Sequence, residues 1–519
     1  MGFRKKPEKS TVRIRQIPTK QPNFITGRNS FMKRKWLAIA LSMALAVGML
    51  SGCGDDKAAD NNAQQTTDDT KEEEPAPADD EKEDEAPAVD LLEDGGGKVL
   101  NIYCWNEEFK ERFEQYYPDY KDGKVGDVEV KFIQNVNEGS NYQDKLDEAL
   151  GKQESAAADD KVDLFMAEAD YIAKYSSAAA DVAVDVHALG LTDEDMSNMY
   201  DYTKQVATDE NGVLKGVSWQ ACPAGMIYRR SMAKKYFGTD DPDAIQEQVS
   251  DWDKFEAACK TIKEKSKGKD FMMAGPNDMH RIYTNNDSTK FVDGDKLTFT
   301  PGSEQWVDNT KKFCDEGYVL SPTMGLWSED WNKNMGKDGH VFAFFGPAWF
   351  ISFTMSAASG ATANDDGTYT HKDGKDSYGD WGLCLGPQSF NWGGTWIMAA
   401  KGTDNAALIK DIMLKMTCDQ TILYNISKDK QDYVNGKEAC EKLSSDGVTA
   451  PFLGDQDMIG TLKQSAENIS MTNLTIYDQA CIENSENDFG DFFSGKSSKE
   501  DCLKKWQDDV LKKFPNLSV

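Results

Sequence analysis

Hydrophobic residues from position 98 onward follow two repeating patterns, one typical of strands and one typical of helices. Short runs rich in Val, Ile, Leu and Phe predict strands at 99–105, 128–133 and 162–166. Apolar side chains at helical spacing predict helices at 107–117, which stops before Pro118, and at 141–150. Strands that alternate with helices usually build a parallel sheet. We therefore predict an α/β fold whose ligand site lies at the carboxyl ends of the strands.

The later part of the chain adds hairpins and further helices. Residues 225–232 read as a strand that leads into a helix ending near 236–237. Predicted hairpins cover 212–219, 291–299 with its Asp-Gly turn, and the exposed stretch 362–377. Predicted helices cover 405–416, 495–514 and, together with a loop, 438–457.

Upstream of the predicted fold the composition changes twice. Residues 54–97 are mostly Asp, Glu, Ala, Pro, Asn, Gln and Thr, and such a run buries too little apolar surface to fold. Its like charges extend it, so we expect a disordered acidic linker. Before it, a basic stretch at 33–35 and an apolar run at 36–50 form a secretory signal. A membrane-spanning helix is the alternative, but a span needs about 20 apolar residues.

The residues that close this signal, Leu50-Ser51-Gly52-Cys53, resemble the bacterial lipobox. In lipoproteins of that kind the cysteine becomes the first mature residue and carries acyl chains such as palmitate, and the resemblance implies the same for Cys53. Two acyl chains on one residue anchor a protein stably. We therefore expect residues 1–53 to be an N-terminal extension and cleaved signal, with Met32 as the true start. The mature protein would sit on the extracellular face of a Gram-positive cell membrane.

Charge and residue usage exclude several kinds of site. The formal net charge of −30 argues against nucleic acid, whose phosphates need clustered Lys and Arg. The ten cysteines and four histidines form no CxxC pair and no metal-ligand spacing, so we expect no metal, no cofactor and mostly buried free thiols. The chain has no GxSxG, HExxH or P-loop pattern. Glu107 and Glu108 invite comparison with a glycosidase pair, but carboxylates are common in a first helical turn, and we predict that the protein is not an enzyme.

Several motifs resemble those of one family when they are taken in order along the chain. The helix start Trp252-Asp253-Lys254-Phe255 is similar to the family's Thr-Trp-Glu-Glu-Leu, and residues 339–349 resemble its G-x-x-A-M-x-x-x-G-P-W run. Residues 391–400 resemble its Gly-Gly strand. The chain departs from the pattern at Tyr228-Arg229-Arg230, where Tyr-Asn-Lys is usual. On these motifs the body resembles the maltose-binding-like extracellular solute-binding proteins of family 1, the receptors of carbohydrate ABC importers.

The resemblance implies an architecture and a partner. It implies a two-lobed periplasmic-binding-protein-like fold of class II, with crossover strands at the hinge. Lobe 1 would comprise residues 98–217 and about 396–460, and lobe 2 would comprise 218–395 and about 461–519. The lobes would close on a small-molecule carbohydrate, and the abundance of aromatic residues for stacking favours an oligosaccharide. The receptor, a monomer, would then deliver it to the permease subunits of an ABC transporter.

Candidate ligand-binding residues follow from the chemistry of sugars, which present hydroxyl edges and apolar C–H faces. A sugar site therefore combines aromatic rings with polar groups on two closing surfaces. Residues of these kinds that the pattern places at strand ends, crossovers or cleft loops are Trp105, Asn106, Glu107, Glu168, Asp170, Trp219, Tyr283, Trp327, Trp331, Trp349, Trp392 and Trp396.

Ordinary structural roles compete with binding for some of these residues. Trp105 ends a buried strand, so it could belong to the core, and Glu168 and Asp170 could be solvated loop charges. Trp327 and Trp331 are four residues apart and could pack one helix face. The ligand also stays open, because acidic residues in a cleft would suit a polyamine, and a peptide is a further candidate. A surface glycoside hydrolase and a polymer-binding adhesin are the remaining alternatives.

Overall fold

The computed structural model describes residues 90–519 apart from 286, 365–367 and 373. The predicted signal, Met32, Cys53 and most of the acidic linker lie outside the described residues. Positions 90–96, the described end of that linker, are exposed and have no regular structure. The amide of Leu92 nevertheless donates to the carbonyl of Ala188 at 2.7 Å. Within the described ranges, no helix combines the length and apolar character needed to cross a membrane.

A seven-stranded mixed sheet forms the core of the first lobe, and its strand order is β2-β3-β4-β1-β5-β15-β6. β1 runs parallel to both β4 and β5, as the alternating pattern predicted. β15 joins antiparallel to β5 although more than 200 residues separate them in sequence. The strands are β1 (Val99–Cys104), β2 (Tyr120–Lys121), β3 (Lys124–Val125), β4 (Val128–Gln134), β5 (Leu164–Glu168), β6 (Val217–Ser218) and β15 (Thr395–Ala399).

Amphipathic helices pack around this sheet. In α1, Phe109 and Phe113 are buried, and the helix ends before Pro118, which cannot continue it. The predicted helix at 141–150 is α2, with the same bounds. These elements are α1 (Glu108–Tyr116), α2 (Asn141–Leu150), η1 (Gln153–Ser155), η2 (Ala158–Asp160), α3 (Ile172–Ser176), α4 (Asp201–Ala207), α12 (Ala406–Met413), η5 (Leu414–Cys418), α13 (Gln420–Lys430) and α14 (Lys437–Ser445).

A second, antiparallel sheet centred on β7 forms the core of the other lobe. Side chains of β7 alternate between two buried clusters, since Ile227 belongs to one and Met226 and Tyr228 to the other. Both faces of this sheet are therefore covered. Its strands are β7 (Pro223–Arg229), β10 (Ala343–Pro347), β13 (Trp381–Cys384) and β14 (Phe390–Asn391), and two small hairpins pair β8 (Val292–Asp293) with β9 (Lys296–Leu297) and β11 (Thr362–Ala363) with β12 (Tyr369–Thr370).

Helices on the second sheet begin at clear capping signals. Asp241 and Asp251 each accept a backbone N–H of the helix that follows, α6 and α7. The elements are α5 (Arg230–Phe237), α6 (Pro242–Val249), α7 (Trp252–Ser266), η3 (Pro276–Met279), α8 (His280–Thr284), α9 (Pro301–Asp315), α10 (Glu329–Lys333), η4 (Phe350–Met355), α11 (Ser356–Ala358), η6 (Pro451–Leu453), α15 (Met458–Ala466), α16 (Asp478–Asp488), α17 (Gly490–Phe493) and α18 (Lys499–Lys513).

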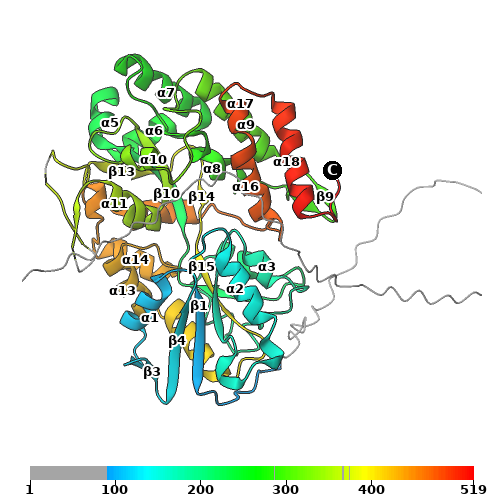
Figure 1. Ribbon diagram of the computed structural model, residues 1–519. Helices are drawn as coiled ribbons and strands as arrows, with labels where there is room; N and C mark the ends of the chain where they lie inside the picture. Colours follow the sequence, from blue (N-terminus) through cyan, green and yellow to red (C-terminus); the bar gives the residue numbers. More distant parts are fainter. Residues whose placement is uncertain (1–89, 286, 365–367, 373) are drawn as a thin grey trace, which may run out of the picture. The chain divides into compact units, whose positions relative to one another are not determined.

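The chain passes between the two sheets more than once. It leaves the first sheet at β6 and enters the second at β7, then returns from β14 to β15. In Figure 1, β1, β4 and β15 lie in the lower part of the folded unit, and β10, β13 and β14 lie in the upper part. This two-lobed α/β architecture with crossover strands is the predicted fold class. All nine cysteines among the described residues are unpaired, and seven of them are buried.

Candidate functional site

The candidate site begins where the second crossover meets the carboxyl end of β5. Thr395, the first residue of β15, pairs with Glu168, the last residue of β5. The crossover itself is Trp392-Gly393-Gly394, between β14 and β15. A parallel sheet gathers the carboxyl ends of its strands at one edge, so this crossover lies at the edge where ligands bind in α/β folds.

Gly393 lets residues of both lobes approach the crossover. Its φ of +71° is a conformation that favours glycine. A Cβ atom built there would lie 3.3 Å from Nε1 of Trp349 and 3.4 Å from Oε1 of Glu168. The crossover therefore brings the indole of Trp349, which follows β10 of the second sheet, close to the carboxyl group of Glu168 at the end of β5 in the first sheet.

Four tryptophans form a cluster at this point, which we call the tryptophan cluster: Trp327, Trp331, Trp349 and Trp392. The rings of Trp327 and Trp349 are nearly parallel, with centroids 6.4 Å apart and an interplanar angle of 21°. Trp392 contacts both of them, at 5.6 and 5.3 Å. Nε1 of Trp349 donates to the backbone carbonyl of Trp392 at 3.0 Å, which fixes the ring against the crossover. The cluster offers the flat apolar surfaces that sugar faces need.

Trp327 is the most accessible member of the cluster. Its side chain is 37% exposed, whereas Trp331, four residues later, is buried and donates from Nε1 to Asp278. The backbone of Trp327 has a φ of +65°, a region that costs a bulky residue about 1–2 kcal/mol. Strain of this kind persists only where the surroundings impose it, and it is concentrated at functional sites.

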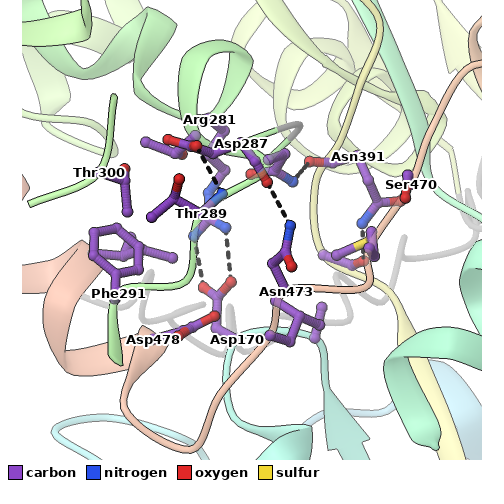
Figure 2. A pocket seen from close by; sticks show the side chains of 17 residues that line it. Asp170, Arg281, Asp287, Thr289, Phe291, Thr300, Asn391, Ser470, Asn473 and Asp478 are labelled. Atoms are coloured by element: carbon purple, nitrogen blue, oxygen red, sulfur yellow. Dashed lines mark hydrogen bonds and ion pairs between the residues drawn. The ribbon is translucent and has the colours of Figure 1, made fainter. Parts of the chain in front are cut away.

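An ion pair joins the lobes beside the cluster. Asp170, just after β5, accepts two hydrogen bonds from Arg281 on α8, at 2.7 and 2.6 Å. Figure 2 shows the two side chains facing each other from opposite sides of the pocket. The Arg281 guanidinium also lies 5.5 Å from the centre of the Trp392 ring. We call Asp170–Arg281 the interlobe ion pair.

Two cavities adjoin Arg281. The larger has a volume of about 50 Å³, and its lining includes Asp170, Asn285, Asp287, Asn391, Asn473 and Asp478. The smaller has a volume of about 10 Å³ and is lined in part by Asp278, Trp331 and Trp392. Nε of Arg281 is buried and has no hydrogen-bond partner among the described residues. A buried donor of this kind is costly to leave unpaired, so Arg281 has hydrogen-bonding capacity to offer a ligand.

The carboxyl group of Glu168 does not carry its usual charge. Burial, and then the negative charge of Asp170, raise the pKa of Glu168 to about 8, although Arg281 opposes the shift. Glu168 is therefore mostly protonated at neutral pH, while Asp170 is paired with Arg281. This trio of Glu168, Asp170 and Arg281 is consequently close to neutral, and each member presents hydrogen-bonding groups.

A second carboxylate pair lies at the first crossover. Nε2 of Gln220 donates to Glu108 at 2.8 Å and to Asp432 at 2.9 Å. Arg112 lies 3.5 Å from Glu108 and 3.8 Å from Asp432. Burial is the main cause that raises the pKa of Glu108 to about 7. Each of the two crossovers thus lies beside a buried carboxyl group with a raised pKa, Glu108 at the first and Glu168 at the second.

The structure places other predicted site residues away from this cluster. Trp219 and Trp396 are buried in the first lobe, where Trp219 packs on Phe109 and Nε1 of Trp396 donates to the carbonyl of Thr203. Tyr283 is buried in the second lobe and stacks on Trp252, with ring centroids 4.1 Å apart. These three side chains contribute to packing in this conformation.

The residues at the end of β1 lie further along the same sheet edge. Trp105 is half-buried, and its ring centroid is 6.2 Å from that of Tyr171, the residue after Asp170. Asn106 and Glu107 are exposed at the start of α1, where Glu107 pairs with Lys110 at 2.9 Å. Nothing in their contacts ties them to the tryptophan cluster.

Sequence reasoning missed Arg281, Asp278 and Phe350. Arg281 lies in a run, Met279-His280-Arg281, that carries no motif. The one available signal was the need of Asp170 for a cationic partner if it is buried. Phe350 follows Trp349 directly, and its ring lies 5.7 Å from Trp392.

A pH dependence of stability follows from the raised pKa of Glu168. Between about pH 4.5 and 8 the folded protein binds more protons at Glu168 than the unfolded chain, so the free energy of unfolding should fall as pH rises through this window. Glu168→Gln should make the thermal midpoint vary less between pH 5 and 8. Asp478 and Asp278, with pKa values raised to about 7 and 6 mainly by burial, should preserve part of the slope. The exposed control Glu329→Gln should leave the profile unchanged, and an equal effect of both variants would contradict this assignment.

Residues 110–436 match the family described as bacterial extracellular solute-binding protein. The chain belongs to this family. No curated protein sequence matches the chain.

Solved structures share the fold of this solute-binding protein at low sequence identity. An extracellular solute-binding protein of family 1 is 16% identical with a TM-score of 0.64, over 80% of this chain and 99% of the other. The lacto-N-biose-bound GL-BP of Bifidobacterium longum is 15% identical with a TM-score of 0.58, over 82% and 100%. The sugar-binding protein MalE from Xanthomonas citri is 12% identical with a TM-score of 0.59, over 80% and 98%.

Proposed function

We propose that this protein is the extracellular receptor of a carbohydrate ABC importer. It would bind a sugar between its lobes and deliver it to the permease. The observation that carries the proposal is the tryptophan cluster beside the Glu168, Asp170 and Arg281 trio, at a crossover between two lobes. Aromatic faces and hydrogen-bonding groups in one site are the combination that a sugar requires.

The charge balance of the site supports a neutral sugar over a polyamine. Asp170 is neutralised by Arg281, and the raised pKa of Glu168 leaves that carboxyl mostly uncharged at neutral pH. A polycation would therefore meet the positive charge of Arg281 and little free negative charge in the trio. Neutral hydroxyl groups would instead find both donors and acceptors.

The relatives point the same way. Among the matching structures, a protein from B. animalis subsp. lactis is in complex with β-1,6-galactobiose and the B. longum protein is in complex with lacto-N-biose. We propose the same class of ligand for this chain, with binding and no catalysis. The lobe boundaries that we propose are 98–217 with about 396–460, and 218–395 with about 461–519.

We also propose that Cys53 carries the lipid anchor and that the mature protein is a monomer on the cell surface of a Gram-positive organism. The support is the lipobox-like sequence 50–53 and the polar run that follows it. Mass spectrometry of the N-terminal peptide from membranes would test this, because a diacylated Cys53 as the first residue is the expected result.

The binding proposal is tested by titration of a soluble chain that starts at Gly54 and so keeps the compact unit 88–519. A panel of mono- to tetrasaccharides built from glucose or galactose would be followed by calorimetry and tryptophan fluorescence. At least one member should bind and change the emission, because the tryptophan cluster lies at the site. Heat from spermidine or a peptide, together with silence across the sugars, would refute the carbohydrate assignment.

A further inference from the structure

The larger cavity beside Arg281 brings together carboxyl groups from both lobes. Asp170 reaches it from the end of β5 in the first lobe, whereas Asp287 follows α8 and Asp478 begins α16 in the second lobe. Figure 2 shows Asp478 and Asp170 on the same side of this cavity. Among the described residues that line it, Arg281 alone is cationic. Three carboxyl groups of this described lining therefore face one guanidinium group, in a volume of about 50 Å³ that leaves room for only a few water molecules.

Two of these carboxyl groups are well supported as anions. The interlobe ion pair accounts for the charge of one of them. Asp287 accepts hydrogen bonds from the backbone amides of Gly302 and Thr289, at 2.5 and 3.1 Å. Asp478 is only 6% exposed, and the hydroxyl of Thr475, a neutral donor, bonds its carboxyl group. Asp478 is therefore the member of the three whose charged form is least well supported.

Other charges near Asp478 do not supply a cationic partner. Lys290 is exposed, so its positive charge lowers the pKa of Asp478 only weakly. α18 packs along α16, but its residues Lys512 and Lys513 line a separate groove together with Glu483. The carboxyl group of Asp478 thus depends on water or on a proton for its neutralisation.

Closure of the lobes creates this environment. α16 meets the first lobe directly, because Nε2 of Gln143 on α2 donates to Oε1 of Gln479, the residue after Asp478, at 3.3 Å. In the closed state, burial is the main cause that raises the pKa of Asp478 to about 7, and the charge of Asp170 adds to it. Separation of the lobes would remove Asp170 and admit water, so the pKa would return toward its usual value. The closed state therefore binds a proton that the open state releases.

We propose that closing the lobes takes up a proton at Asp478, so that a fall in pH favours the closed state. The preference for closure is fully present below the usual pKa of an aspartate and is lost as pH rises through about 7. For one such group, the ratio of closed to open protein should fall about tenfold between pH 6 and pH 8. The inference concerns lobe closure, so it goes beyond the proposed function and does not require that the ligand be a sugar.

Small-angle scattering of the ligand-free soluble chain from Gly54, at pH 6 and at pH 8, tests this coupling. The wild type should have the larger radius of gyration at pH 8. Asp478→Asn replaces the protonated carboxyl with a neutral group of the same shape, so this variant should open less between the two pH values. Glu168, whose pKa is also raised, should account for the opening that remains. A wild-type radius of gyration that is the same at both pH values would overturn the proposal.

A matched control and a second variant sharpen the test. Asp201 is likewise the first residue of a helix, α4, but its side chain is 75% exposed. Asp201→Asn should behave like the wild type, and equal effects of the two asparagine variants would contradict a special role for Asp478. Thr475→Val removes the hydroxyl that stabilises the charged carboxylate, so opening should shift to higher pH, which a merely structural role of Asp478 would not produce.

The outcomes separate this inference from the proposed function. If the chain binds none of the sugars but opens with rising pH as described, the carbohydrate function fails and the proton coupling stands. If it binds sugars while its scattering does not depend on pH, the proton coupling fails and the receptor function stands.

Discussion

Replacing Trp349 with alanine is expected to weaken sugar binding by at least about 100-fold. Its ring stacks near-parallel to Trp327, contacts Trp392 at 5.3 Å and hydrogen-bonds the crossover carbonyl. Truncation would remove a stacking surface and also release the support of two neighbouring rings. Central aromatic anchors commonly contribute 2–4 kcal/mol to binding, and about 2.8 kcal/mol corresponds to 100-fold. Calorimetry with the tightest-binding saccharide of the panel measures the loss.

A matched control distinguishes loss of the site from loss of any tryptophan. Trp252 is partly exposed in the second lobe and stacks on Tyr283, outside the tryptophan cluster. Trp252→Ala should therefore alter fluorescence and stability but leave affinity within about threefold. Trp349→Phe should retain part of the binding because it keeps an aromatic face. Equal affinity losses in the Trp252 and Trp349 variants would show that the cluster has no special role.

Most of the fold could be predicted because it depends on local periodicity. The helix at 141–150 has buried residues at one face, and the strand pattern at 128–133 matches β4 within one residue. The order of motifs also led to a two-lobed architecture with crossover strands. One difference arises at 405–416, where α12 ends at Met413 and the chain continues as the π-helical turn η5 to Cys418. The hydroxyl of Thr417 donates to the carbonyl of Met413 there, a side-chain bond that competes with regular helix.

The candidate site was less accessible to sequence reasoning. Trp349 and Trp392, the tryptophans next to glycine motifs, lie together at the crossover. Gly393 helps to explain this, because its φ of +71° favours glycine and a side chain there would crowd Trp349 and Glu168. Trp219 and Trp396 resemble them in sequence but are buried. Near a crossover both faces of a strand can be covered by protein. The alternation of apolar and polar residues in the sequence then does not reveal whether a tryptophan ring points into the core or toward the site. The partner of Asp170 is 111 residues away and is set by tertiary structure alone.

Replacing Arg281 with methionine is expected to open the ligand-free protein. Arg281 contributes the two bonds that hold Asp170 across the lobes, and its side chain is only 15% exposed. Removal of one member of a buried ion pair typically costs 3–5 kcal/mol, and this cost falls on the closed state because opening rehydrates Asp170. About 3 kcal/mol changes the ratio of closed to open protein by more than 100-fold. Small-angle scattering without ligand should show a larger radius of gyration than for the wild type.

The double variant Asp170→Asn with Arg281→Met provides the decisive comparison. It removes the unpaired charge as well as the bond, so the lobes should open less than in Arg281→Met alone. Asp181 and Lys401 form an exposed ion pair at 2.6 Å within the first lobe, and Lys401→Met is the matched control that should leave the scattering unchanged. An unchanged radius of gyration in Arg281→Met would mean that packing of the lobes, and not this pair, holds the closed state. Because Arg281 also lies over Trp392, opening should increase solvent exposure of that ring and shift its fluorescence to longer wavelength.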